Sequence, residues 1–116
     1  MRVKSGKHGA DVRYLHPAVW GALFIARLLW LEQFPQYEFV ITSANEGKHQ
    51  TGSRHYLGLA ADFRTKDPMG KWALSDEERL SFKLEYAKRV GDEFDVTISQ
   101  PYLNCHVELD AKGPLR

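Results

Sequence analysis

The stretch Ser53-Arg54-His55-Tyr56-Leu57-Gly58-Leu59-Ala60-Ala61-Asp62 carries the strongest signal in the sequence, together with a later motif, Cys105-His106-Val107-Glu108. The first motif places a histidine and an aspartate seven positions apart with small residues between them, and the second adds a histidine in a strand-like segment. Two histidines and a carboxylate form a ligand set for zinc that leaves one coordination position open. The sequence therefore predicts a metal site for which the rest of the chain is scaffold.

The spacing of the first motif constrains the backbone. An extended chain would separate His55 from Asp62 by roughly 20 Å, whereas both donor atoms must come within about 2.0–2.2 Å of one zinc ion. The chain must turn back between them, and Gly58 is placed to permit this turn. In most proteins, one histidine and one aspartate at this spacing are a loop residue and a capping residue. The spacing of the whole stretch from Ser53 to Asp62 favours a metal site.

Length and charge bound the class of protein. A chain of 116 residues is expected to form a single domain over residues 1–116 with its own core. Its 16 basic and 15 acidic side chains nearly cancel, so we expect neither nucleic acid nor a membrane as its partner. Cys105 is the one cysteine in the sequence, which excludes an internal disulfide and a cysteine-rich zinc finger.

The apolar run from Ala18 to Leu31 resembles a membrane segment at first sight. It has 14 residues and is interrupted by Arg27, whereas a span needs about 20 apolar residues. It also begins late for a signal peptide and lacks a cleavage motif. We expect a buried helix, and a protein that is made in the cytoplasm without a signal peptide.

Local signals predict two main helices. The first runs from Pro17 to about Gln33 and carries a wide apolar face that includes Phe24, Leu28 and Leu31, so we expect protein nearly all round it, or a sheet on one side with one flank in a cleft. The second follows a capping box at Ser75 and Glu78 and stops at Gly91. Its expected inward residues are Leu80, Leu84, Ala87 and Val90.

Strands are predicted at residues 38–42, 59–63, 94–99 and 105–109, with a short one near residues 2–4, and the last two main strands form a hairpin. The order of helices and strands indicates an α+β fold with a small antiparallel-rich sheet and two main helices.

The two motifs resemble those of the zinc D-Ala-D-Ala carboxypeptidase and L-alanyl-D-glutamate endopeptidase group, which shares its fold with the hedgehog N-terminal domain. The resemblance covers roughly residues 39–110. Its first motif is matched position for position by Ser53, His55, Gly58, Ala60 and Asp62, and its third ligand by His106.

This resemblance implies a hedgehog-like zinc peptidase whose Zn²⁺ is bound by His55, Asp62 and His106. It implies Ser53 as a contact to the peptidoglycan stem peptide. Arg54 and Arg64 flank the motif and are expected either to meet stem-peptide carboxylates or to form surface pairs. A monomeric carboxypeptidase or endolysin-type endopeptidase is expected, acting at the cell wall if it is a phage-type lysis protein.

The chain departs from this group at the general base. Members of the group have an acidic residue three positions before the last ligand or a histidine two positions before it, where this chain has Leu103 and Asn104. Neither side chain accepts a proton from water at neutral pH. Glu108 shares a strand face with His106 and is our candidate catalytic base. The alternatives are that Glu108 supports His106 or is a surface charge, in which case the domain binds zinc and a peptide or protein partner without cleaving it. Asp95 is a weaker candidate base.

Overall fold

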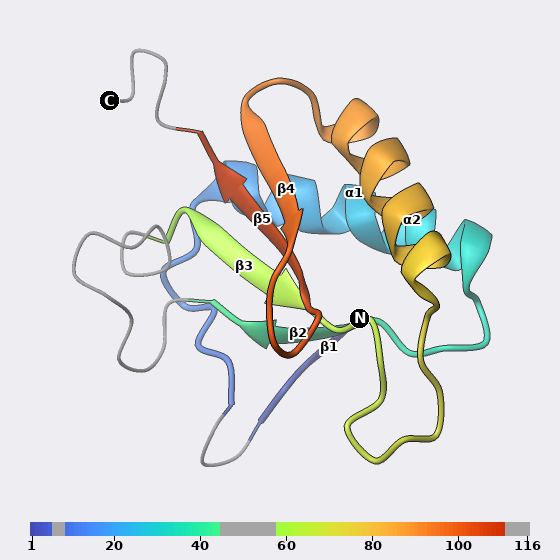
Figure 1. Ribbon diagram of the computed structural model, residues 1–116. Helices are drawn as coiled ribbons and strands as arrows, with labels where there is room; N and C mark the ends of the chain where they lie inside the picture. Colours follow the sequence, from blue (N-terminus) through green and yellow to red (C-terminus); the bar gives the residue numbers. More distant parts are fainter. Residues whose placement is uncertain (6–8, 45–57, 111–116) are drawn as a thin grey trace.

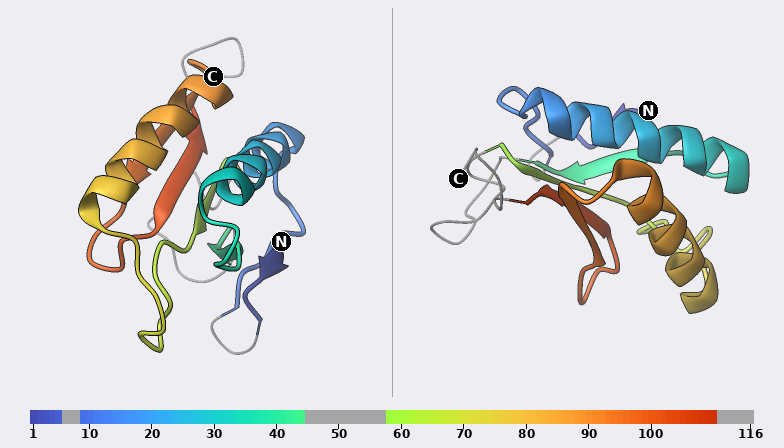
Figure 2. Two further views of the ribbon diagram at one scale, coloured as in Figure 1. Left: turned by 90° about the vertical axis from the view of Figure 1, so that its right-hand side faces the viewer. Right: turned by 90° about the horizontal axis from the view of Figure 1, so that it is seen from above.

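The computed structural model describes residues 1–5, 9–44 and 58–110. Its strands form one five-stranded mixed sheet, and its two helices pack on the same face of that sheet (Figures 1 and 2). The elements in chain order are β1 (Arg2–Val3), α1 (Pro17–Gln33), β2 (Val40–Ser43), β3 (Ala60–Phe63), α2 (Asp76–Val90), β4 (Phe94–Ile98) and β5 (Cys105–Leu109). The predicted α+β class is confirmed.

The strand order is β1-β2-β3-β5-β4, with β1 parallel to β2 and the other neighbours antiparallel. The hairpin of β4 and β5 is therefore confirmed, and β5 lies between β4 and β3. In β5, Cys105 and Val107 are fully buried against the helices, whereas His106 and Glu108 lie on the opposite face. The sheet thus has one face in the core and an opposite face on which no helix of the described residues packs.

Helix α1 has the predicted start and end. Pro17 occupies its first turn, and the backbone N–H of Ala18 donates to Nδ1 of His16 at 3.0 Å. The buried stripe of the helix consists of Val19, Ala22, Leu23, Ala26, Leu29 and Trp30. Within the described ranges, no helix combines the length and apolarity needed to cross a membrane.

The expectation that protein surrounds α1 nearly all round is wrong. Phe24, Leu28 and Leu31 are 55%, 59% and 46% exposed. Ala22 and Ala26 bring the other side of the helix close to the sheet, and the large residues are left on the outer side. Helix α1 is a layer on the sheet and not a central helix.

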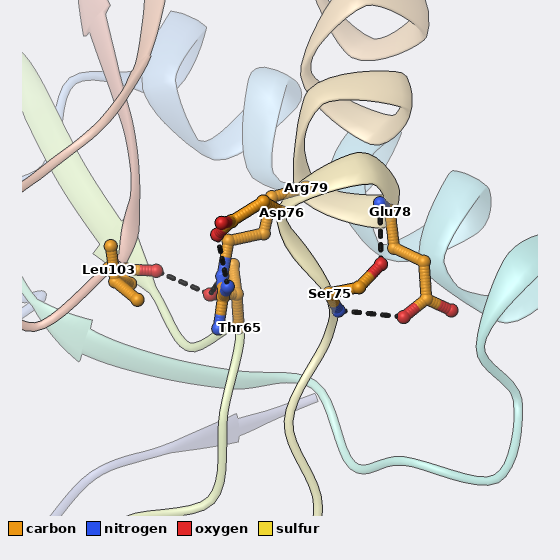
Figure 3. A network of polar contacts seen from close by, with 6 residues as sticks. All are labelled: Thr65, Ser75, Asp76, Glu78, Arg79 and Leu103. Carbon is orange, nitrogen blue, oxygen red and sulfur yellow. Dashed lines mark hydrogen bonds and ion pairs between the residues drawn. The ribbon is translucent and has the colours of Figure 1, made fainter.

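Helix α2 also has the predicted ends. Both halves of the capping box are formed, with the backbone N–H of Glu78 donating to Oγ of Ser75 and that of Ser75 donating to Oε1 of Glu78 (Figure 3). The helix stops at Gly91, whose φ of 89° suits glycine.

The predicted inward face of α2 is wrong for Leu80 and Leu84, which are 54% and 56% exposed. The buried residues are Arg79, Phe82 and Tyr86. The two aromatic rings fill the space between α1 and the sheet, and the hydroxyl of Tyr86 donates to the carbonyl of Ala22 at 2.7 Å. Ala87 and Val90 pack at the edge of the core, as predicted.

A buried polar network fastens α2 to the end of the β4–β5 hairpin (Figure 3). The Nε of Arg79 donates to Oγ1 of Thr65 at 2.7 Å, and the Thr65 hydroxyl donates to the carbonyl of Leu103. Arg79 also forms an ion pair with Asp76 at 3.2 Å. Since both Thr65 and Arg79 are buried, the hydroxyl that joins them is the centre of the network.

Replacing Thr65 by valine is expected to destabilise the fold by about 1–3 kcal/mol, because the carbonyl of Leu103 and the guanidinium of Arg79 both lose a buried partner. Chemical denaturation measures this change. Thr65→Ser keeps the hydroxyl and is the control, so equal destabilisation by the two variants would contradict a role for the hydroxyl.

Candidate metal centre

Asp62 and His106 lie side by side on the face of the sheet opposite the two helices. They are partners in the antiparallel register of β3 and β5, and Oδ1 of Asp62 lies 2.6 Å from Nδ1 of His106. The side chains are only 15% and 18% exposed, respectively. Two of the three predicted ligands, from motifs 44 residues apart, therefore meet in one partly buried position.

Glu108 contacts the other side of the same imidazole. Its Oε1 lies 2.8 Å from Nε2 of His106, so the ring is held between two carboxylates. Asp95 is exposed on β4 opposite Glu108 in the register. Of the two acidic residues considered as bases, Glu108 is the one that touches a predicted ligand.

The two carboxylates control the charge of His106. Burial by itself would lower the pKa of the imidazole, but the hydrogen bonds and negative charges of Asp62 and Glu108 outweigh it and raise the pKa above its usual value. Because its pKa is raised, His106 keeps its proton to a higher pH than a free imidazole does, and a metal ion would have to displace that proton.

The pair of Asp62 and His106 fits a zinc ion in donor type and in position. Two ligands at about 2.1 Å in tetrahedral geometry are about 3.4 Å apart, so the 2.6 Å separation must open by less than about 1 Å. Nδ1 of His106 would be the ligand atom, and Glu108, whose Oε1 lies 2.8 Å from Nε2, would orient the imidazole.

The remaining predicted residues of the first motif, Ser53, Arg54 and His55, lie outside the described residues. Within the described part of the chain, no three His, Cys, Asp or Glu residues form a group that could hold a metal ion. The third ligand remains a prediction from the sequence.

Gly58 meets a steric requirement where the described chain resumes before β3. Its φ is 72°, and a Cβ atom there would lie 2.1 Å from the carbonyl oxygen of Tyr14. Its own carbonyl accepts from the backbone N–H of His16 at 2.8 Å. A glycine is therefore needed at this position of the motif to pack the chain against the segment before α1.

Leu103 and Asn104, at the positions where the peptidase group that the motifs resemble has a base, have other roles in this structure. Leu103 has a φ of 60°, and its carbonyl accepts a hydrogen bond from Oγ1 of Thr65. Asn104 lines a pocket of about 420 Å³ beside the candidate centre. Cys105 is fully buried on the opposite face, as the alternation of the strand predicted.

The sequence contains only a partial indication of this pocket. Arg64 is expected from the sequence to meet a carboxylate or to form a surface pair, whereas no motif marks Lys4 and Lys66, which also line the pocket. In an extended chain, Arg64 and Lys66 lie on the same side as Asp62. This alternation is the signal in the sequence that indicates a basic surface next to Asp62.

Comparisons of the chain with protein-family models, with curated protein sequences and with solved structures give no match. The functional assignment therefore depends on the motifs and on the geometry of this site.

Proposed function

We propose that this protein is a zinc peptidase of hedgehog-like fold that hydrolyses peptide bonds in bacterial cell-wall stem peptides, as a carboxypeptidase or an endolysin-type endopeptidase. One observation carries the proposal: Asp62 and His106, assigned as ligands from two separate motifs, have donor atoms 2.6 Å apart on one face of the sheet. An arbitrary pair of motifs has no reason to converge in this way.

Each of the proposed site residues has a separate role. Zn²⁺ would be held by His55, Asp62 and His106, and when bound it supplies polarisation of the scissile carbonyl and a nucleophilic water at neutral pH. Asp62 is fixed by the ladder between β3 and β5. Glu108 fixes the imidazole of His106 through Nε2. Ser53 and Arg54 are proposed contacts to the stem peptide.

A second candidate is a zinc domain that binds a peptide or protein partner without cleaving it. The observation that favours it is the engagement of Glu108 with His106, because a carboxylate in this position supports a ligand and is not directed at a water. Leu103 and Asn104 offer no replacement base.

Zinc analysis of the purified protein, coupled to mass spectrometry of a muropeptide digest, tests both candidates. A peptidase is expected to contain one zinc per chain and to release a defined stem-peptide fragment, and His55→Ala should abolish both. Stoichiometric zinc without any cleavage would select the binding domain. Absence of zinc after purification at neutral pH would overturn both.

The role of Glu108 is separately testable. Because Glu108 contacts His106, Glu108→Gln is expected to weaken zinc binding about 10–100-fold, as the loss of a carboxylate behind a ligand histidine usually does. A competition titration with a chromophoric chelator measures the affinity.

Asp95→Asn is the matched control for Glu108→Gln, since Asp95 lies opposite Glu108 on the neighbouring strand and its loss removes the same charge. It should leave the affinity nearly unchanged. Unaltered zinc affinity in Glu108→Gln together with lost cleavage would instead make Glu108 the base.

A further inference from the structure

A basic pocket lies beside the candidate metal centre. It has a volume of about 420 Å³ and is lined by Lys4, Thr42, Arg64, Lys66, Pro68, Tyr102 and Asn104. These residues come from the chain after β1, from β2, from the segment after β3 and from the turn before β5. The fold thus collects three cationic side chains from distant parts of the sequence.

The positive charge of this pocket is not neutralised within the described part of the chain. There, the side chains of Lys4, Arg64 and Lys66 form no salt bridge, although all three are half-buried. Half-buried cations without counter-ions are costly unless an anion joins them.

The pocket also contains a neutral hydrogen-bonding group that is not used. The Oγ1 of Thr42 is buried and has no hydrogen-bond partner among the described residues. Buried hydroxyls are normally satisfied, so this one marks an unsatisfied polar position in the lining of the pocket.

The pocket continues the face that carries the metal centre. Arg64 follows Asp62 by two residues and its N–H extends the ladder to the carbonyl of Val40, while Asn104 precedes His106 by two residues. Two residues of strand span about 7 Å. The bond from Thr65 to the carbonyl of Leu103 holds the two chain segments together at this level (Figure 3).

We propose that this basic pocket is a subsite that binds a carboxylate of the peptide ligand, one or two residues from the bond placed at Asp62 and His106. The inference rests on the proposed function for the identity of the ligand. A residue of extended peptide spans about 3.5 Å, so a spacing of about 7 Å admits this separation. Guanidinium, ammonium and hydroxyl donors together match the oxygens of a carboxylate.

A titration of the zinc-free protein tests the subsite without depending on hydrolysis. The probes are N-acetyl-D-alanyl-D-alanine and its C-terminal amide, followed by the backbone amide NMR signals of residues 64–66 and 102–104. The acid is expected to shift these signals and to bind at least tenfold more tightly than the amide, because only the acid carries the charge that the pocket lacks.

Lys66→Gln and Lys71→Gln form a matched pair for this titration. Both remove one ammonium group from the same part of the chain, but Lys71 is exposed and does not line the pocket. Lys66→Gln should remove most of the preference for the acid, and Lys71→Gln should retain it. Equal binding of acid and amide, or equal weakening by both variants, would overturn the subsite.

The outcome can be separated from that of the proposed function. Cleavage of acid and amide peptides with the same efficiency by the zinc-loaded protein would overturn the subsite and leave the peptidase standing. A preference for the acid that depends on Lys66, in a protein that takes up no zinc, would support the subsite and reject the peptidase.

Discussion

Replacing Asp62 by asparagine is expected to abolish stoichiometric zinc binding and, with it, cleavage of stem peptides. The amide has nearly the same size as the carboxylate and can still meet Nδ1 of His106, but it supplies no negative oxygen to a metal ion. The loss of affinity should exceed the roughly 10–100-fold that the loss of a supporting residue costs. Metal analysis after dialysis against a competing chelator measures it.

The matched control for Asp62→Asn is Asp95→Asn. Asp95 is an exposed carboxylate on β4, so its replacement removes the same charge without touching the pair of Asp62 and His106. The thermal transition of each zinc-free variant shows whether the fold is intact. Full zinc content in a folded Asp62→Asn protein would show that Asp62 is not a zinc ligand. The proximity of Asp62 and His106 would then no longer support a metal site.

The sequence predicts those features of the fold that depend on local chemistry. Pro17, the capping box at Ser75 and Glu78, and the glycine at Gly91 each act within one helical turn, and the helices begin and end where these residues indicate. The contact between Asp62 and His106 can also be predicted from the sequence. Strand alternation predicts which face of the sheet each side chain lies on, and the two motifs predict that these two residues meet.

Features that depend on packing between distant segments cannot be predicted from local sequence patterns. The basic pocket needs the parallel pairing of β1 with β2, which brings Lys4 next to Thr42, and no local pattern encodes that pairing. Glu108 lies two residues after His106 in β5, so strand alternation predicts their shared face, whereas the contact of Oε1 with Nε2 depends on the conformations of the two side chains. This contact favours a supporting role of Glu108 behind His106, and the zinc affinity of Glu108→Gln tests that role against a role as the base.

Helix α2 shows the same limit in its apolar face, because its sequence contains two overlapping stripes. Leu80 and Leu84 form one stripe, whereas Phe82 and Tyr86 form another. The larger aromatic side chains bury more apolar area and occupy the core, which leaves the leucines on the outside.

Replacing Phe82 by alanine is consequently expected to cost about 3–5 kcal/mol of the free energy of unfolding. Phe82 is 1% exposed. Its ring lies between 5.6 and 6.2 Å, centroid to centroid, from the rings of Trp30, Phe34, Phe63 and Tyr86. Truncation leaves a cavity where α1, α2 and the sheet meet, and Trp30 and Phe63 lose their edge-to-face contacts with the ring. Chemical denaturation measures the change.

Leu84→Ala is the control that separates the two stripes, since it lies on the same helix two residues further on. Because Leu84 is more than half exposed, its truncation should change the stability by no more than about 0.5 kcal/mol. If the stripe of Leu80 and Leu84 faced the core, Leu84→Ala would destabilise the fold more than Phe82→Ala. A larger loss in Leu84→Ala than in Phe82→Ala would mean that α2 packs on the sheet through its leucines, and the aromatic core of this fold would then be wrong.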